Sequence, residues 1–258
     1  MKREDSKFSR AVMAAAILVS LAAVWRHYQP PNRDLAFPAG GIVIGVDASF
    51  PPFAFDNAGA LEGLDIELGE AIAAEIGLPA RFVNISYYGL YDALITGGVD
   101  LLIAALRVDQ SRRNEVRFTQ AYFDNGLVLV TAANGEPINV NALSGAALAY
   151  EYASGADSRI RAWEEEGHTI ARLPYELPTH ALDALRLGQV DAALVDAITL
   201  RLYAKERAEW EYSRQFVTRE PYAIALRIDR EDARKLVDRA LAALKDRGEL
   251  ARIVQKWF

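Results

Sequence analysis

Cysteine is missing from this chain of 258 residues, and histidine occurs only three times. Without cysteine there can be no disulfide, no thiol chemistry, no cysteine ligand for a metal and no lipid-modified N-terminal cysteine. His27, His168 and His180 are irregularly spaced, which argues against a histidine-based metal site. A glycine-rich phosphate loop, a Ser-His-Asp spacing and a zinc motif are also missing. The sequence therefore implies no metal, no cofactor and no catalytic residue.

An excess of positive charge is also lacking. Lysine and arginine total 29 against 35 for aspartate and glutamate, which gives a net charge of −6. A nucleic-acid partner is excluded on this ground, because such proteins carry a basic footprint. Hydrophobic residues make up 52% and charged residues 25%, as in a globular protein with a sizeable core. The length allows one large domain or two small ones.

The N-terminus is the one segment with an unusual composition. Four lysines and arginines among the first ten residues precede an apolar run over residues 11–25. This run is shorter than the roughly 20 residues that a membrane-spanning helix needs, and it suits the core of a signal peptide. An uncleaved anchor and a buried core helix are the alternatives. We predict a signal peptide or membrane anchor over residues 1–26 and a proline-containing tether over residues 27–40.

From residue 41 onward, short apolar runs alternate with helical patterns, which is typical of an α/β protein. A helix is predicted over residues 65–76, because Gly77 provides its stop. A long helix is predicted to start at an Asp229 cap and to end at Gly248. Further strands are predicted over residues 42–46, 81–85, 99–106, 127–131, 146–150, 190–195 and 222–226, and further helices over 90–96, 155–166, 179–187 and 250–257.

A weak internal repeat suggests two similar units. Residues 93–100 resemble residues 184–191, and both read as the end of a helix, a glycine turn and a strand. A pair of α/β lobes accounts for this repeat, and the alternative is a chance match of a common helix-turn-strand pattern.

Charged residues follow the carboxyl ends of the predicted strands. Ligands bind at that edge in open α/β sheets. The strand ends lead to Asp47, Arg107, Glu151 and Asp196, and Arg112 follows five residues after Arg107. Both signs of charge are present and both units contribute. The pattern therefore predicts a site for a small ligand that carries a positive and a negative charge.

Arg112 and Asp196 are the two residues best suited to such a ligand. The planar guanidinium of Arg112 can bind a carboxylate with two hydrogen bonds, near the start of a helix expected over residues 111–116. An ionised Asp196 only accepts hydrogen bonds and so suits an ammonium group. A ligand held by both would join the two lobes and favour their closure. Phe50 and Tyr87 could form aromatic walls.

Each assignment has a structural alternative. Asp196 could merely cap the helix that follows it, and Arg112 could be a surface arginine. Arg107 is as suited to an ion pair between the lobes as to a ligand contact. Glu151 is more often solvated than ligating at such a position.

Ordered motifs in the chain resemble those of the family 3 extracellular solute-binding proteins, which bind polar amino acids for ABC importers. The motifs lie at residues 45–53, 63–68, 99–123, 190–196, 222–227 and 256–258. The resemblance implies a periplasmic binding protein type II fold, with two Rossmann-like lobes joined by two hinge crossings near Thr131 and Thr218. The first lobe would comprise residues 41–130 and 219–258, and the second lobe residues 131–218.

The resemblance also implies roles for single residues. Arg112 would bind the ligand carboxylate, Asp196 its ammonium group and Asp47 its side chain. Phe50 and Tyr87 would sandwich the ligand, a backbone group of Ala105 would contact the carboxylate, and Ser154 is kept from the loop of the second lobe. The expected ligand-binding residues are thus Asp47, Phe50, Tyr87, Ala105, Arg107, Arg112, Ser154 and Asp196.

Two departures bear on specificity. The family usually has serine or threonine at the position of Arg107, and an apolar residue at that of Glu151. Asp47 and Glu151 favour a cationic ligand side chain, whereas Arg107 favours an anionic one. If Arg107 pairs with Glu151, Asp47 alone selects the side chain, and a polar or basic amino acid is favoured.

The resemblance implies a monomeric binding protein that works in the periplasm or at the outer face of the cytoplasmic membrane. It would deliver an amino acid to the permease of an ABC importer. One rival is an enzyme resembling cyclohexadienyl dehydratases, whose catalytic glutamate falls near Asp157 and would need a raised pKa. The shorter acid and the retained Asp196 count against it. Another rival is a membrane-tethered amino-acid sensor acting through a separate partner.

Overall fold

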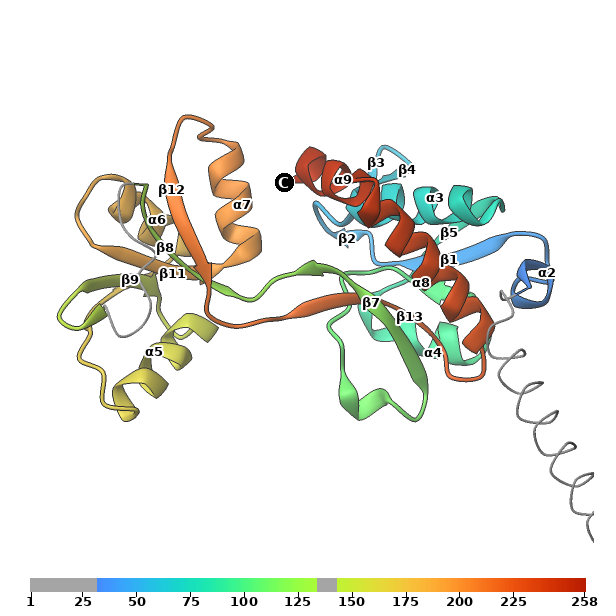
Figure 1. The fold of residues 1–258 in the computed structure, drawn as a ribbon, viewed down its shortest axis with the longest axis horizontal. Coiled ribbons are helices and arrows are strands. Elements are labelled where there is room, and N and C mark those ends of the chain that lie inside the picture. The colour runs from blue at the N-terminus through green and yellow to red at the C-terminus, as the bar shows by residue number, and fades with distance from the viewer. Residues whose placement is uncertain (1–31, 134–142) are drawn as a thin grey trace, which may run out of the picture.

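The computed structural model describes residues 32–133 and 143–258 (Figure 1). The predicted signal peptide or anchor lies outside these residues. Two five-stranded sheets, each with its own helices, stand beside each other and are linked by two chain segments. The predicted α/β architecture with two Rossmann-like lobes is therefore confirmed.

The first sheet has the strand order β5-β1-β6-β13-β7. Its first three strands are parallel, whereas β13 runs antiparallel to both of its neighbours. A small separate sheet, β2-β3-β4, follows β1 in the chain. The strands of both sheets are β1 (Ile42–Val46), β2 (Ser49–Phe50), β3 (Ala54–Asn57), β4 (Ala60–Glu62), β5 (Ala80–Asn84), β6 (Leu101–Leu102), β7 (Val116–Asp124) and β13 (Pro221–Arg227), and the helices are α2 (Arg33–Ala36), α3 (Leu64–Ile76), η1 (Tyr87–Gly89), α4 (Leu90–Ile95), η2 (Gln110–Arg112), α8 (Glu231–Asp246) and α9 (Glu249–Trp257).

The second sheet has the order β10-β9-β11-β8-β12. The three strands β10, β9 and β11 are parallel, and β8 and β12 complete the sheet in antiparallel fashion. Its elements are β8 (Leu127–Ala132), β9 (Ala147–Glu151), α5 (Gly155–Glu165), β10 (Ala171–Tyr175), α6 (Pro178–Arg186), β11 (Ala192–Asp196), α7 (Ala197–Lys205) and β12 (Tyr212–Phe216).

Each sheet has its own buried core. Ile44, Leu101 and Ile224 lie in a cluster with residues of α3, α8 and α9. Leu148 and Trp163 belong to a cluster whose buried residues all lie between Leu129 and Leu194, in the second sheet, its helices and their connections. Because burial of apolar area drives folding, each sheet with its helices has a driving force of its own.

The chain crosses between the sheets twice. The first crossing, expected near Thr131, lies at Asn125 and Gly126, because Thr131 is already paired with Ser213 inside the second sheet. The second lies between β12 and β13, where Thr218 was expected. The Thr218 hydroxyl accepts a hydrogen bond from the backbone N–H of Leu127 at 2.8 Å, so the two crossings are bonded to each other.

Three local predictions were wrong. The strand expected over residues 99–106 is reduced to β6, because Ala105 has a positive φ of 46° and leaves the ladder. The helix expected over residues 111–116 is the single turn η2, and Val116 already starts β7. Asp229 caps no helix: Arg230 precedes α8, and the Asp229 carboxylate instead accepts a bond from Nε of Arg227 at 2.6 Å.

Candidate functional site

The carboxyl ends of the parallel strands of the first sheet surround a hollow of about 510 Å³. Asp47 follows β1 directly, and the segment after β6 contributes Ala105 and Arg107. The amino end of β13 reaches the same edge, because this strand runs antiparallel to its neighbours. The lining residues of this first hollow are Asp47, Ser49, Phe50, Tyr87, Ala104, Ala105, Arg107, Glu220 and Tyr222.

A second hollow, of about 400 Å³, lies at the carboxyl ends of β9 and β11. The N-termini of α5, α6 and α7 contribute to it, and helix N-termini favour negative charge nearby. Glu220 lines both hollows. The lining residues of this second hollow are Asn125, Leu127, Glu151, Ser154, Gly155, Ala156, Pro178, Leu194, Val195, Asp196, Thr218 and Glu220.

Asp47 and Phe50 are placed in the first hollow by the turn after β1. The Oδ1 atom of Asp47 accepts hydrogen bonds from the backbone N–H of Ser49 at 3.1 Å and from its hydroxyl at 2.7 Å. These bonds fix the orientation of the carboxylate, and its second oxygen, Oδ2, takes no part in them. The ring of Phe50 stacks on that of Phe53 with 5.3 Å between centroids. Phe50 therefore offers an exposed face beside a fixed carboxylate.

Arg107 makes an ion pair, but its partner is Glu220 rather than Glu151. The distance from Arg107 Nη1 to Glu220 Oε1 is 2.8 Å. The Glu220 backbone N–H is fixed in turn by Asp124 Oδ1 at 2.8 Å. Burial and the charge of Glu220 raise the pKa of the neighbouring Tyr222 to about 12. The condition under which Asp47 alone would choose the ligand, an Arg107–Glu151 pair, is thus not met.

Arg112 lies beside the first hollow and not in it. It lines an adjoining hollow of about 500 Å³ that shares Tyr87 and Arg107 with the first. Its guanidinium lies 3.9 Å from the ring centroid of Tyr91, and its Nη1 is 3.1 Å from Glu115 Oε2. An exposed pair of this kind contributes little free energy, so a ligand carboxylate can replace it.

Asp196 caps α7, as the structural alternative predicted. Its Oδ1 accepts from the backbone N–H of Thr199 at 2.9 Å, and its Oδ2 accepts from the Thr199 hydroxyl at 2.6 Å. Each carboxylate oxygen can accept a further bond, so capping leaves room for an ammonium group in the second hollow. The cap and a ligand role are compatible.

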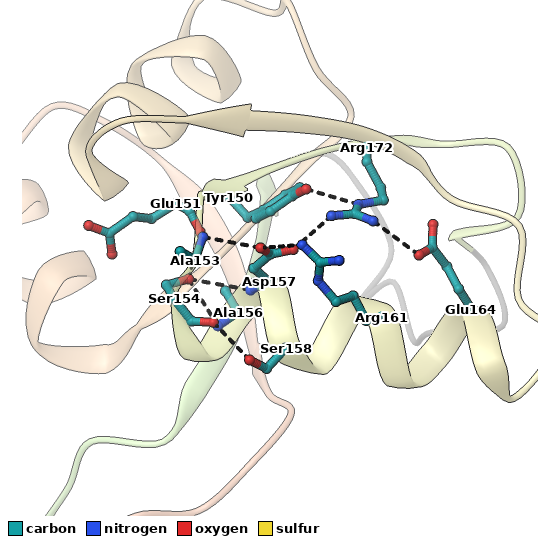
Figure 2. A network of polar contacts seen from close by, with 10 residues as sticks. All are labelled: Tyr150, Glu151, Ala153, Ser154, Ala156, Asp157, Ser158, Arg161, Glu164 and Arg172. Atoms are coloured by element: carbon teal, nitrogen blue, oxygen red, sulfur yellow. Dashed lines mark hydrogen bonds and ion pairs between the residues drawn. The ribbon is translucent and has the colours of Figure 1, made fainter.

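Glu151 ends β9, and Ser154 is the cap residue of α5 three positions later (Figure 2). The Ser154 hydroxyl accepts from the N–H groups of Ala156 and Asp157 at 3.1 and 3.3 Å and donates to the Glu151 carbonyl at 2.7 Å. The predicted cap is confirmed, and it occupies most of this hydroxyl. The Glu151 side chain extends away from the network around Asp157 and lines the second hollow.

Asp157 is bound to two arginines (Figure 2). Its carboxylate accepts from Arg161 Nη2 at 3.0 Å and from Arg172 Nη2 at 2.7 Å. The hydrogen bond from Arg161 is the main reason why the pKa of Asp157 is lowered. A catalytic acid at this position would need the opposite shift.

The backbone N–H of Ala105 is occupied by a buried carboxylate. It donates to Asp65 Oδ2 at 2.9 Å and to the Tyr122 hydroxyl at 3.0 Å, and that hydroxyl donates to Asp65 Oδ1 at 2.8 Å. Asp65 is 0% exposed, and burial raises its pKa to about 7. Asp65 and Tyr122 thus hold the segment before Arg107 in its unusual conformation. Only the carbonyl of Ala105 is left for a ligand.

Replacing Asp65 with asparagine should change how stability depends on pH. The folded pKa of about 7 lies above the usual 3.8, so the folded state binds the proton more tightly. The contribution of Asp65 is full below about pH 4 and is lost as the pH rises to about 7, by up to roughly 4 kcal/mol. Urea unfolding between pH 4 and 8 should therefore show the wild type losing stability relative to Asp65→Asn.

Asp157→Asn provides the control of opposite sign. Because the pKa of Asp157 is lowered, its contribution should be lost only in acid. A wild-type minus Asp65→Asn difference that stays constant from pH 4 to 8 would contradict a raised pKa at Asp65.

Glu220 and Tyr222 line the first hollow, and the sequence predictions missed both of them. The strand-end rule was applied to carboxyl ends only, and these residues stand at the amino end of β13. An antiparallel strand brings its amino end to the edge where its parallel neighbours have their carboxyl ends. The charged Glu220 just before the apolar run of β13 was the available signal.

The remaining predictions about chemistry concern absences. Within residues 32–133 and 143–258 there is no group of three or more histidine and acidic side chains that could hold a metal. No helix in those two ranges combines the length and the apolar character needed to cross a bilayer.

Two five-stranded sheets joined by two crossings, with a charged hollow at the carboxyl ends of the parallel strands of each sheet, have the architecture of the periplasmic binding protein type II fold. Residues 42–258 match the family model described as bacterial extracellular solute-binding proteins, family 3. The chain belongs to this family, so the resemblance inferred from its motifs is confirmed.

Named relatives match most of this chain, and most of each relative is covered by the match. The ABC transporter glutamine-binding protein GlnH of Bacillus subtilis is 28% identical, with 84% of this chain and 81% of the relative covered. The L-cystine-binding protein TcyJ of Escherichia coli is 26% identical, with coverages of 85% and 83%. The unliganded, open L-cystine solute receptor of Neisseria gonorrhoeae is 18% identical, has a TM-score of 0.73 and covers 87% of this chain and 95% of its own.

Proposed function

We propose that this protein captures an amino acid between its two lobes, with Arg112 binding the carboxylate and Asp196 the ammonium group. The observation that carries the proposal is the pair of charged hollows at facing sheet edges, which share Glu220. Relatives named for glutamine, cystine and arginine support an amino-acid ligand. Asp47, Phe50, Tyr87, Arg107, the Ala105 carbonyl and Ser154 would complete the site.

The charge of the two hollows favours a polar or basic amino acid. Asp47, Glu151, Asp196 and Glu220 line them, whereas Arg107 is their one cation among the lining residues. The Arg107–Glu220 pair cancels one charge of each sign. Three carboxylates then remain in the two hollows, with Arg112 as the one further cation of the proposed site, so a ligand with an additional positive charge fits better than an anionic one.

The two lobes are best assigned from the sheets. The first comprises residues 33–124 and 221–258, because Ala36 and Phe37, from the segment expected to be a tether, are buried in its core. The second comprises residues 127–216, and the crossings between them act as the hinge. A ligand that touches both hollows binds the closed arrangement better, and it shifts the population toward closure.

Membership of an extracellular family supports a place of action outside the cytoplasm. We assign residues 1–26 to export as a signal peptide or anchor. The receiving partner would be the permease of an ABC importer, and the protein would act as a monomer. Binding rather than catalysis is favoured, because the pKa of Asp157 is lowered instead of raised.

A thermal-shift screen with the twenty common amino acids tests this function. A cognate ligand at about 100 times its dissociation constant contributes roughly 2.7 kcal/mol, which raises the melting temperature by about 5–10 °C. We expect the largest shift with a basic or polar amino acid. No shift with any amino acid would refute the proposal, and turnover of prephenate or arogenate would favour the enzyme instead.

A further inference from the structure

A groove separate from the hollows described above lies between α7 and α9, on the other side of the two crossing segments. In Figure 1 the end of α9 faces α7 above the two crossing segments, whereas α4 and α5 lie below them. The groove has a volume of about 700 Å³, and its walls come from α7 and β12 of the second sheet and from α8 and α9 of the first. None of the ligand-binding residues proposed above lines it.

Four cations line this groove, namely Arg201, Lys205, Arg214 and Lys245. Its lining contains no aspartate or glutamate, although acidic residues outnumber basic ones in the chain. Within residues 32–133 and 143–258, none of the four makes an ion pair. We name this feature the basic groove.

Arg201 is the most constrained of these cations. Its Nε is buried and has no hydrogen-bond partner among the described residues, and its guanidinium lies 5.5 Å from the ring centroid of Phe123. Burial, and then the charge of Arg214, lower the pKa of Arg201. A buried, unpaired donor next to a like charge is unfavourable, and a bound anion would relieve both problems.

The other two cations stand on opposite walls. Lys205 Nζ donates to the backbone carbonyl of Lys256 at 2.9 Å, which joins α7 to the end of α9. Lys245 Nζ donates to Gln120 Oε1 at 2.9 Å and to the carbonyl of Ala121 at 2.7 Å. Both ammonium groups are therefore held at the groove by neutral acceptors.

From this geometry we propose that the basic groove binds a free multivalent oxyanion of the phosphate type, which bridges the two lobes. Arginine guanidinium groups suit the oxygens of such an anion, and lysine supplies point charge. An anion held between Arg201 and Arg214 on one side and Lys245 on the other would link α7 to the first lobe. It would stabilise the arrangement in which Lys205 contacts the end of α9.

The test measures inorganic phosphate binding in the absence of any amino acid, so its result is independent of the proposed function. Melting temperatures and calorimetric titrations would be compared in sodium phosphate and in sodium chloride of equal ionic strength. We expect a saturable rise with phosphate alone. Arg201→Gln should weaken phosphate binding at least tenfold, and so should Arg214→Gln, whose exposed side chain can be changed without disturbing the core.

Arg239→Gln is the matched control, because Arg239 is an exposed cation of α8 outside the groove and its loss changes the net charge equally. It should bind phosphate like the wild type. Equal effects of phosphate and chloride would overturn the proposal. So would unchanged phosphate binding in Arg214→Gln, or co-sedimentation with phosphatidylglycerol vesicles without any response to inorganic phosphate, which would place the phosphate on a lipid.

Discussion

Replacing Arg112 with alanine should strongly weaken ligand binding while the ligand-free protein stays folded. Among the described residues, the Arg112 guanidinium pairs with Glu115 and, at 4.0 Å, with Asp109, and it lies over the face of Tyr91. These solvent-accessible contacts together contribute about 1 kcal/mol. Losing a contact in which a guanidinium holds a carboxylate by two hydrogen bonds costs about 2–4 kcal/mol of binding free energy. The dissociation constant, measured by calorimetry with the amino acid from the screen, should therefore rise roughly 30- to 1000-fold.

Arg113→Ala is the control for this variant. Arg113 is the next residue, is exposed and lines neither the first hollow nor the one beside it. Its replacement removes the same charge and should leave affinity within about twofold. An Arg112→Ala protein that binds as tightly as Arg113→Ala would show that the carboxylate is held elsewhere, with Arg107 as the next candidate.

Replacing Gly126 with alanine should strongly destabilise the protein. A Cβ atom at this position would lie 2.0 Å from the carbonyl oxygen of Thr218 and 2.9 Å from the Cα of Arg219, both of them backbone atoms of the other crossing. The crossings would have to separate, which would stretch the bond between Leu127 N–H and the Thr218 hydroxyl. We expect a loss of about 3 kcal/mol and a melting temperature lower by roughly 6–12 °C.

Gly155→Ala serves as the comparison for Gly126→Ala. Gly155 opens α5, and an added Cβ would meet no atom within 4 Å. Alanine there should leave stability unchanged or raise it by up to about 1 kcal/mol, because it restricts the unfolded chain. Equal melting temperatures for the two variants would mean that the crossings tolerate a side chain and lie farther apart than the contacts at Gly126 indicate.

The buried elements of the fold could be predicted from the sequence. The apolar run of β1 has no polar residue to interrupt it, and Gly77 ends α3 as expected. Ser154 was recognised as a cap, because a serine before a helical pattern has a specific local role. These signals depend on residues close together in the chain.

Features that depend on distant partners escaped prediction. Nothing near Ala105 in the sequence shows that Asp65, forty residues earlier, holds its N–H and ends β6 early. Asp229 lost its expected capping role to an ion pair with Arg227. The Arg107–Glu220 pair joins residues more than one hundred positions apart. The sequence therefore predicted the charged residues of the site but not which of them form ion pairs with each other.

The position of β13 constrains the order in which the protein can form during synthesis. This strand lies between β6 and β7, yet the ribosome makes it after every other strand. Until residues 221–227 emerge, β6 and β7 have no common neighbour, whereas the strands from β8 to β12 are already complete. The second sheet can thus mature first. A nascent chain stopped at Phe216 would carry this finished sheet and a first sheet that lacks β13, the strand between β6 and β7.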